Sequence, residues 1–302
     1  MSNVHMPSVN TTITITPTNS TAPEQDEAFY LTKVISYASV SVLIIAGNLL
    51  CLVVFLRTPQ MRRKRAYYLL VSLSIADALV GISCAERTAQ MRYPAVANEN
   101  SNTFSVLNFL ASPASLFTLS AISIERFIAT VFPLRHRIFG VLPYAVLLGV
   151  PWASAAVIFM IVIFTKLKVL PSVWVTYTRI TIPIPLLIIF ICYTALVAKL
   201  KYGSRVMSVG NGQLLRDRKL AITLLIVTLL SLITWVPFGV YVEVLNYCVT
   251  CKEERYARDL YLVLNCLKGL NSAINVVVYM FRMPDFKRGV GKIVPGRQQN
   301  MS

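Results

Sequence analysis

SIERFIATVFPLRHR (residues 123–137) places two ionised side chains, Glu125 and Arg126, at the end of an apolar run that starts near residue 103. A proline and three basic side chains follow within the same stretch. About 20 apolar residues are enough to cross a bilayer as a helix. The stretch therefore indicates a membrane-spanning helix that ends in an acid–arginine pair at the membrane surface.

Six further apolar runs of similar length accompany this one. The chain has 302 residues, of which 56% are hydrophobic and only 14% charged, whereas soluble domains carry about 25% charged residues. The runs do not alternate in polarity, which argues against a membrane β-barrel, and no internal repeat suggests an inverted-repeat transporter. The predicted fold is an all-α seven-transmembrane helix bundle, with spans near 29–56, 67–86, 103–132, 142–165, 173–200, 218–245 and 258–281.

The net charge of +16 comes from basic residues bunched in the short connections. Cytoplasmic loops of membrane proteins are rich in Lys and Arg, so RTPQMRRKR (57–65) and the other basic connections are predicted to be cytoplasmic. The N-terminus is then outside, which agrees with glycosylation acceptors at Asn10 and Asn19. We find no nucleic-acid-binding motif and expect no nucleic-acid partner.

Three segments follow from this topology. Residues 1–28 form an extracellular, glycosylated tail, residues 29–282 the seven-transmembrane domain, and residues 283–302 an interfacial helix with a short cytoplasmic tail. The third assignment depends on residues 283–294, where Phe286, Val290 and Ile293 recur at helical spacing among basic residues. This pattern is typical of a short amphipathic helix on a membrane surface. The alternative is a disordered basic tail.

Asp77 is an ionisable residue in the middle of a predicted span, and such residues are costly and often functional. Neutral oxygens on other spans could meet it. One carboxylate among such oxygens suits a small hard cation, and Na⁺ is the most available. Alternatively, a hydrogen-bonded Asp77 only holds helices together. The expected partners are Asn48, Ser115, Asn271, Ser272 and Asn275.

Arg126 is predicted to lie at the cytoplasmic mouth of the bundle, about 16 Å along its helix from Ser115. There it can pair with Glu125, or with Asp217 at the inner start of the sixth helix. Loss of an interhelical Arg126–Asp217 contact would open a crevice, which is how a two-state switch works. The simpler alternative is an arginine that snorkels at a helix end.

Short motifs in the predicted helices match one family in order and spacing. Over about residues 29–290 the chain resembles the rhodopsin-like (class A) G-protein-coupled receptors, with features of both adenosine and melanocortin receptors. The matching elements are GN at 47–48, SLSIAD at 72–77, SIERF at 123–127 followed by PL at 133–134, Trp152, Pro185 with Tyr193, TWVPF at 234–238, and LNSAIN at 270–275 with Tyr279.

The resemblance implies roles for individual residues. Arg126, with Glu125 and Asp217, would control activation, while Trp235 would be the toggle at the floor of the ligand pocket. Tyr193 and Tyr279 would swing inward on activation, and Pro133 and Leu134 would present a loop to the G protein. The family's allosteric Na⁺ site would be formed by Asp77, Ser115, Asn271, Ser272 and Asn275.

Several positions depart from the family pattern. Phe127 replaces a tyrosine, Val276 a proline and Ser231 a phenylalanine. Because Val restores a backbone donor, the usual kink of the seventh helix is in doubt. Ser101 stands where relatives have the cysteine of the usual outer bridge, and CVTC supplies Cys248 and Cys251 between the sixth and seventh helices. We expect that pair to form a small disulfide ring in an oxidising compartment.

The ligand-binding residues are expected in the outer half of the bundle. Asn108 stands where amine receptors carry an aspartate, which disfavours an amine ligand. Lys268 could meet a ligand carboxylate or phosphate, or pair with Glu86. It is one residue from Gly269, the position that matches the retinal-binding lysine of opsins. The full expected set is Arg87, Asn108, Phe109, Trp235, Phe238, Tyr241, Asn265 and Lys268.

The predicted function is a plasma-membrane receptor that converts binding of an extracellular small molecule or peptide into activation of a heterotrimeric G protein. Neither a nucleophile–base arrangement nor metal-ligand spacing suggests an enzyme, and no cofactor is expected besides allosteric Na⁺. A receptor that binds ligand with little signalling remains an alternative because of Val276 and Ser231. A retinal-binding photoreceptor and a transporter are the others.

Overall fold

The protein is described here by a computed structural model. It describes residues 22–93, 103–171, 173–174, 181, 183–202, 212–248 and 255–293. Within these ranges the side chains are described except those of residues 22–26, 103–106, 200–202, 212–221, 223–225, 227–228, 246, 255–256 and 258.

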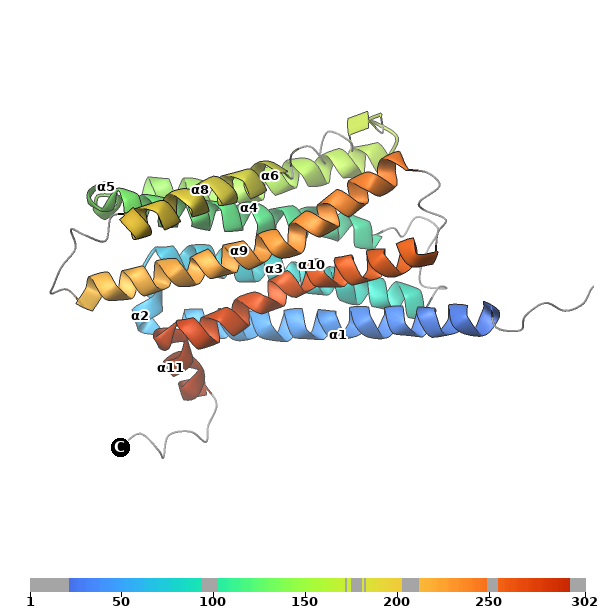
Figure 1. Ribbon diagram of the computed structural model, residues 1–302, viewed down its shortest axis with the longest axis horizontal. Coiled ribbons are helices and arrows are strands. Elements are labelled where there is room, and N and C mark those ends of the chain that lie inside the picture. Colours follow the sequence, from blue (N-terminus) through green and yellow to red (C-terminus); the bar gives the residue numbers. More distant parts are fainter. Residues whose placement is uncertain are drawn as a thin grey trace, which may run out of the picture.

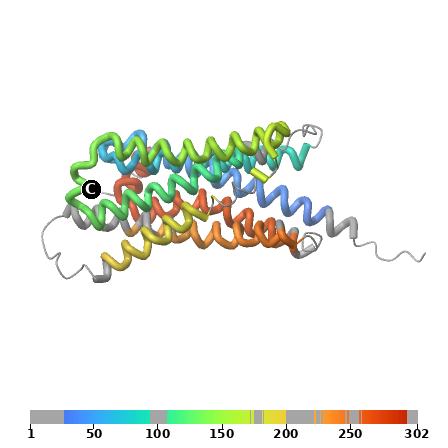
Figure 2. Tube along the Cα trace, turned by 90° about the horizontal axis from the view of Figure 1, so that it is seen from above, coloured from blue at the N-terminus to red at the C-terminus, as the bar shows by residue number. Residues whose placement is uncertain are grey.

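In the described part of the chain seven long helices lie side by side and form one elongated bundle (Figures 1 and 2). Among the described residues, five helices are long and apolar enough to cross a membrane, and two shorter apolar segments, Pro183–Lys199 and Leu229–Leu245, complete the set. This confirms the predicted helical membrane fold. The long helices are α1 (Ala22–Arg57), α3 (Ala66–Arg92), α4 (Thr103–Val131), α6 (Val141–Lys166), α8 (Pro183–Tyr202), α9 (Gly212–Tyr247) and α10 (Arg255–Arg282).

The first helix is longer than its predicted span. Helix α1 begins at Ala22, inside the segment 1–28 that was expected to be an extracellular tail. Its membrane-spanning part, Glu27–Arg57, agrees with the span predicted near 29–56. The described part of helix α8 begins at Pro183, and residues 173–174 and 181 of the expected fifth span are helical as well. Residues 175–180 and 182 lie outside the described part of the chain.

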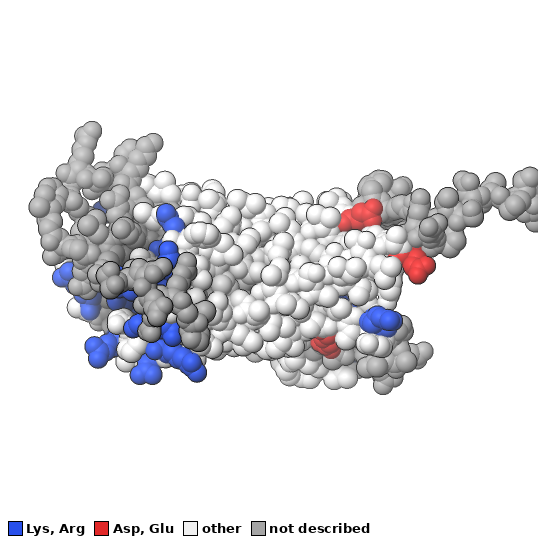
Figure 3. Space-filling view, turned by 90° about the horizontal axis from the view of Figure 1, so that it is seen from below, with Lys and Arg blue, Asp and Glu red and all other residues white. Residues whose placement is uncertain are grey.

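Charged side chains divide the bundle into two ends and an uncharged middle (Figure 3). Lys and Arg gather at one end, which we call the basic end, and acidic side chains appear mainly at the other, the opposite end. The basic residues follow the ends of α1, α4 and α10 at Arg57, Arg135 and Arg282. An uncharged band between two polar ends is the surface that a bilayer requires.

Three short helices lie at the basic end: α2 (Pro59–Arg62), α5 (Pro133–Arg137) and α11 (Pro284–Ile293). Helix α11 turns away from the end of α10 (Figure 1) and corresponds to the amphipathic helix predicted at 283–294. The ring of its Phe286 contacts Phe55 of α1 and Tyr279 of α10, with centroids 5.5 and 5.9 Å apart. Aromatic packing of this kind fixes α11 against the bundle.

Helices α1 and α10 are in tight contact at Gly47. A Cβ atom added to Gly47 would lie 2.8 Å from Cγ2 of Val276. Val276 is the residue that replaces the expected proline, and α10 continues through it without interruption from Arg255 to Arg282. The absence of a side chain at Gly47 therefore makes room for the branched side chain of Val276.

Replacing Gly47 by Ala is expected to lower the melting temperature, because overpacking a tight contact costs about 1–3 kcal/mol. Adding Val276→Ala to the same chain should restore most of the loss, since it removes the clashing methyl group. Thermal unfolding of the purified variants measures both effects. Gly149→Ala on α6 is the matched control, because its Cβ would meet nothing within 4 Å. Additive effects of the two substitutions would contradict the close contact.

Candidate functional site

Asp77 lies at the centre of the bundle, fully buried on α3. Its Oδ1 accepts hydrogen bonds from Ser115 Oγ on α4 (2.6 Å) and Ser272 Oγ on α10 (2.8 Å). Its Oδ2 accepts one from Asn275 Nδ2 (2.7 Å). We call these four residues the Asp77 cluster. They join three helices through one carboxylate, and the structure thus brings together four of the five residues predicted for a Na⁺ site.

The surroundings of the Asp77 cluster contain carbonyl oxygens that no donor reaches. Asn48 uses its Nδ2 to donate to Ser272 O (3.0 Å) and Ile44 O (3.0 Å), and its Oδ1 stays without a partner among the described residues. The buried Oδ1 atoms of Asn271 and Asn275 are in the same situation. Buried acceptors normally have a partner. One negative carboxylate and several unused neutral oxygens fit a monovalent hard cation.

The same donor set does not suit a transition metal. Among the described residues, no three His, Cys, Asp or Glu side chains form a group that could hold one. Softer metals prefer imidazole and thiolate ligands, and the Asp77 cluster contains neither. Na⁺ bound to Asp77 and its serine neighbours would supply a positive charge to a carboxylate that otherwise has only neutral hydrogen-bond donors.

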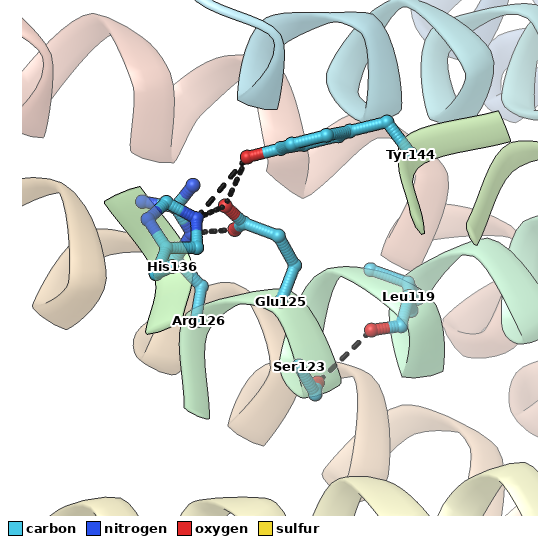
Figure 4. A network of polar contacts seen from close by, with 6 residues as sticks. All are labelled: Leu119, Ser123, Glu125, Arg126, His136 and Tyr144. Atoms are coloured by element: carbon cyan, nitrogen blue, oxygen red, sulfur yellow. Dashed lines mark hydrogen bonds and ion pairs between the residues drawn. The ribbon is translucent and has the colours of Figure 1, made fainter. Parts of the chain in front are cut away.

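A second polar cluster lies near the basic end and is built around Glu125 (Figure 4). Glu125 has 0% exposed surface. Its Oε2 pairs with Nε of Arg126, and its Oε1 lies 2.8 Å from Nε2 of His136. Tyr144 on α6 donates its hydroxyl to the same Oε1 (3.1 Å). We call these four residues the Glu125 cluster.

The Glu125 cluster connects three parts of the chain. Glu125 and Arg126 belong to α4, His136 to α5 and Tyr144 to α6. Pro133 makes this possible, because it begins the short helix α5 at a fixed φ and returns His136 towards Glu125. Of the two predicted partners of Arg126, Glu125 is the one in contact. The side chain of Asp217 lies outside the described residues, so that pairing stays a prediction.

Helix α5 presents an apolar surface beside this cluster. Leu134 is 77% exposed, and Phe132 and Ile138 on either side of the helix are exposed too. Apolar side chains gathered on a surface outside the bilayer often mark a protein–protein contact. Pro133 and Leu134 were the residues expected to present a loop to a partner, and the structure places both on the surface.

Tyr279 occupies the basic half of α10. Its ring packs between Phe55 and Phe286, with centroids 5.7 and 5.9 Å away. The side chain is buried, yet its hydroxyl has no hydrogen-bond partner among the described residues. A buried unpaired hydroxyl is destabilising. A movement of Tyr279 that gave its hydroxyl a hydrogen-bond partner would therefore be favourable.

The part of the bundle nearer the opposite end holds a third group of predicted residues. Lys268 Nζ lies over the rings of Trp235 (5.3 Å to the centroid) and Phe238 (4.7 Å). The guanidinium of Arg87 lies over the ring of Tyr37 at 5.2 Å. The Tyr37 hydroxyl accepts a hydrogen bond from Asn265 Nδ2 (2.5 Å). Helices α1, α3, α9 and α10 thus contribute to one region.

Comparison with known proteins identifies this arrangement. Residues 47–279 match the model of the 7 transmembrane receptor (rhodopsin family). The chain belongs to the rhodopsin family of receptors. This confirms the resemblance drawn from its motifs: the protein is a class A G-protein-coupled receptor and not an enzyme.

Several curated proteins align with most of the receptor. The human "Probable G-protein coupled receptor 21" is 24% identical over 88% of this chain and 84% of its own length. The rat "Somatostatin receptor type 5" is 26% identical over 83% of this chain and 74% of its own. The zebrafish (Danio rerio) "Galanin receptor 2b" is 26% identical over 82% of this chain and 70% of its own length. These similarities leave the subfamily of the receptor unresolved.

The remaining predicted residues of the receptor are less clearly grouped. Asn108 accepts a hydrogen bond from Ser112 on its own helix (2.8 Å), and Phe109 and Tyr193 are half-buried. Tyr241 donates its hydroxyl to Ala257 O (2.7 Å) and so ties α9 to α10. Cys248 is disulfide-bonded. Its expected partner Cys251 and the glycosylation acceptors Asn10 and Asn19 lie outside the described residues.

Sequence reasoning missed three residues of the receptor's polar clusters. His136 and Tyr144 were not predicted to meet Glu125, and Tyr37 was not connected to Asn265. A buried glutamate needs several hydrogen-bond donors, so the sequence could have indicated that Glu125 has further partners. It could not indicate which residues these are.

Proposed function

We propose that the receptor lies in the plasma membrane with its N-terminus outside and its basic end in the cytoplasm. An extracellular ligand binds between Lys268, Trp235 and Phe238, and this binding releases Arg126 at the other end of the bundle. The positive-inside rule supports the orientation, because most of the Lys and Arg side chains visible on this face gather at one end (Figure 3). A heterotrimeric G protein is the proposed cytoplasmic partner.

One observation carries this proposal: the Arg126–Glu125 pair is buried beside an exposed apolar helix, α5. The guanidinium is held by a carboxylate that also contacts α5 and α6. Release of this contact would free Arg126 and shift α5 relative to the bundle. Two discrete arrangements with a small energy difference are what ligand-driven switching requires.

Na⁺ is proposed as an allosteric ligand of the Asp77 cluster. Asp77, Ser115 and Ser272 would bind it, and the buried Oδ1 atoms of Asn271 and Asn275, which have no described partner, are further candidate ligands. Na⁺ held there would tie α3, α4 and α10 together in the arrangement described above. Any ion that binds one state better shifts the population towards that state, so Na⁺ would lower ligand-independent activity.

The test is catalysed nucleotide exchange on purified G proteins. The full-length receptor in lipid nanodiscs is mixed with heterotrimers of each Gα class, and nucleotide exchange is compared with that on empty nanodiscs. We expect at least one class to exchange faster with the receptor, and more so in choline chloride than in NaCl. Exchange that no Gα class accelerates would favour a receptor that binds ligand without signalling. Ion flux through receptor-containing liposomes would instead favour a transporter.

A further inference from the structure

Lys268 is buried far from either end of the bundle. It lies nine residues after Asp259, where the membrane-spanning part of α10 begins, and so about 14 Å along the helix. Its side chain lies within the bundle, and only 8% of the residue is exposed. Ammonium groups at such depth in a membrane protein are costly and normally have an anionic or hydrogen-bonding partner.

In this receptor the ammonium has aromatic neighbours instead. The rings of Trp235 and Phe238 are its contacts, and among the described residues no oxygen lies within hydrogen-bonding or ion-pair distance of Nζ. Glu86, the acid considered as its partner, accepts a hydrogen bond from Gln90 (3.4 Å). Cation–π contacts offset part of the cost of burial, but they leave three N–H donors unused.

The buried carboxylates described in the bundle have other partners. Asp77 accepts hydrogen bonds from Ser115, Ser272 and Asn275, and Glu125 pairs with Arg126. Among the described residues Lys268 therefore has no anionic partner, and its positive charge attracts a negative group.

We propose that the ligand of the receptor carries a carboxylate attached to an apolar or aromatic group. The carboxylate binds Lys268 Nζ, and the apolar group lies against Trp235 and Phe238. The proposal rests on the function proposed above, because it specifies the chemistry of that ligand. The single charge of Lys268 matches a monocarboxylate, and the rings of Trp235 and Phe238 match an apolar group.

The binding test uses matched acids and neutral amides on the purified full-length receptor without G protein. The probes are 4-phenylbutyrate and laurate, each beside its amide, and a phenylalanine-terminated tripeptide with a free or an amidated C-terminus. We expect at least one acid to raise the melting temperature above its amide. Which of the acids does so shows whether the receptor prefers a free carboxylic acid or the C-terminus of a peptide. Equal shifts for every acid and its amide would overturn the proposal.

Variants of Lys268 separate binding from folding. Lys268→Gln is expected to lower the affinity for the acid that stabilises the receptor by about 10- to 100-fold, since a charged hydrogen bond is lost. Lys268→Arg should retain part of that affinity. Lys64→Gln, an exposed residue between α2 and α3, should leave binding unchanged. An acid that stabilises Lys268→Gln as strongly as the unmodified receptor would contradict the assignment.

Lys268→Met provides a second, ligand-free measurement. Removing a buried charge that lacks an anionic partner should raise the melting temperature by a few degrees. A fall of several degrees would mean that Lys268 holds the apo receptor together, which would overturn the proposal. Because none of these measurements uses a G protein, stabilisation by an acid together with absent nucleotide exchange would retain the ligand class and reject the signalling function.

Discussion

Replacing Glu125 by Gln is expected to raise ligand-independent nucleotide exchange by about tenfold or more. The carboxylate of Glu125 is buried and shared by Arg126, His136 and Tyr144. Gln keeps the size of the side chain but removes the charge. Hydrogen bonds to charged groups contribute about 1.5–3 kcal/mol each, and a shift of about 1.4 kcal/mol between two states changes their ratio tenfold.

The opposite result is expected when the other member of the pair is removed. Arg126→Ala breaks the same contact, but it also removes the guanidinium that is proposed to engage the G protein, so exchange should fall to the level of empty nanodiscs. Tyr144→Phe deletes one hydroxyl only and should raise exchange severalfold. If Arg126→Ala also increased exchange, the guanidinium would not be needed to engage the G protein. If Glu125→Gln left exchange unchanged, the Glu125 cluster would be structural support rather than a latch.

The second large effect concerns Na⁺. Asp77→Asn is expected to abolish the stabilisation of the receptor by NaCl relative to choline chloride. For a ligand present at ten times its Kd, that stabilisation is about 1.4 kcal/mol, which thermal unfolding detects readily. Asn fills the space of Asp77 and can still accept hydrogen bonds from Ser115 and Ser272, so its folding should survive while the negative charge is lost.

Two serines on the same helices provide controls for the Na⁺ experiment. Ser272→Ala should weaken the response without abolishing it, because it removes one oxygen of the Asp77 cluster. Ser83→Ala should leave it unchanged, since Ser83 is buried on α3 but donates to Val80 O of its own helix (2.8 Å). A Na⁺ response that persists in Asp77→Asn would show that the ion acts elsewhere.

The sequence was sufficient for the architecture because each span is long and apolar enough to be recognised on its own. The ends of the helices were harder to predict. Helix α1 starts at Ala22, ahead of its predicted span, and a hydropathy pattern does not detect polar residues that extend a helix beyond the apolar run. The start of the fifth span near 173 stays a prediction, because residues 175–180 and 182 lie outside the described part of the chain.

The candidate site was predictable where partners lie on facing helices at similar depth. Asp77 and Asn275 could be paired in this way, because both lie at mid-membrane. His136 could not be paired with Glu125, since its position depends on the turn at Pro133 and not on helix depth. The surroundings of Lys268 were likewise undetermined, because both Glu86 and a ligand remained possible until the rings of Trp235 and Phe238 were located.

The shared packing of Tyr279 has a consequence for how the receptor senses its membrane. Its ring supports Phe286 on α11, a helix that also carries the exposed Lys287 and Lys292. If Tyr279 swings inward on activation, α11 loses that support, and anionic phospholipids holding the two lysines would oppose the movement. Because such coupling is reciprocal, the composition of the inner leaflet would help to set how tightly the extracellular ligand is bound.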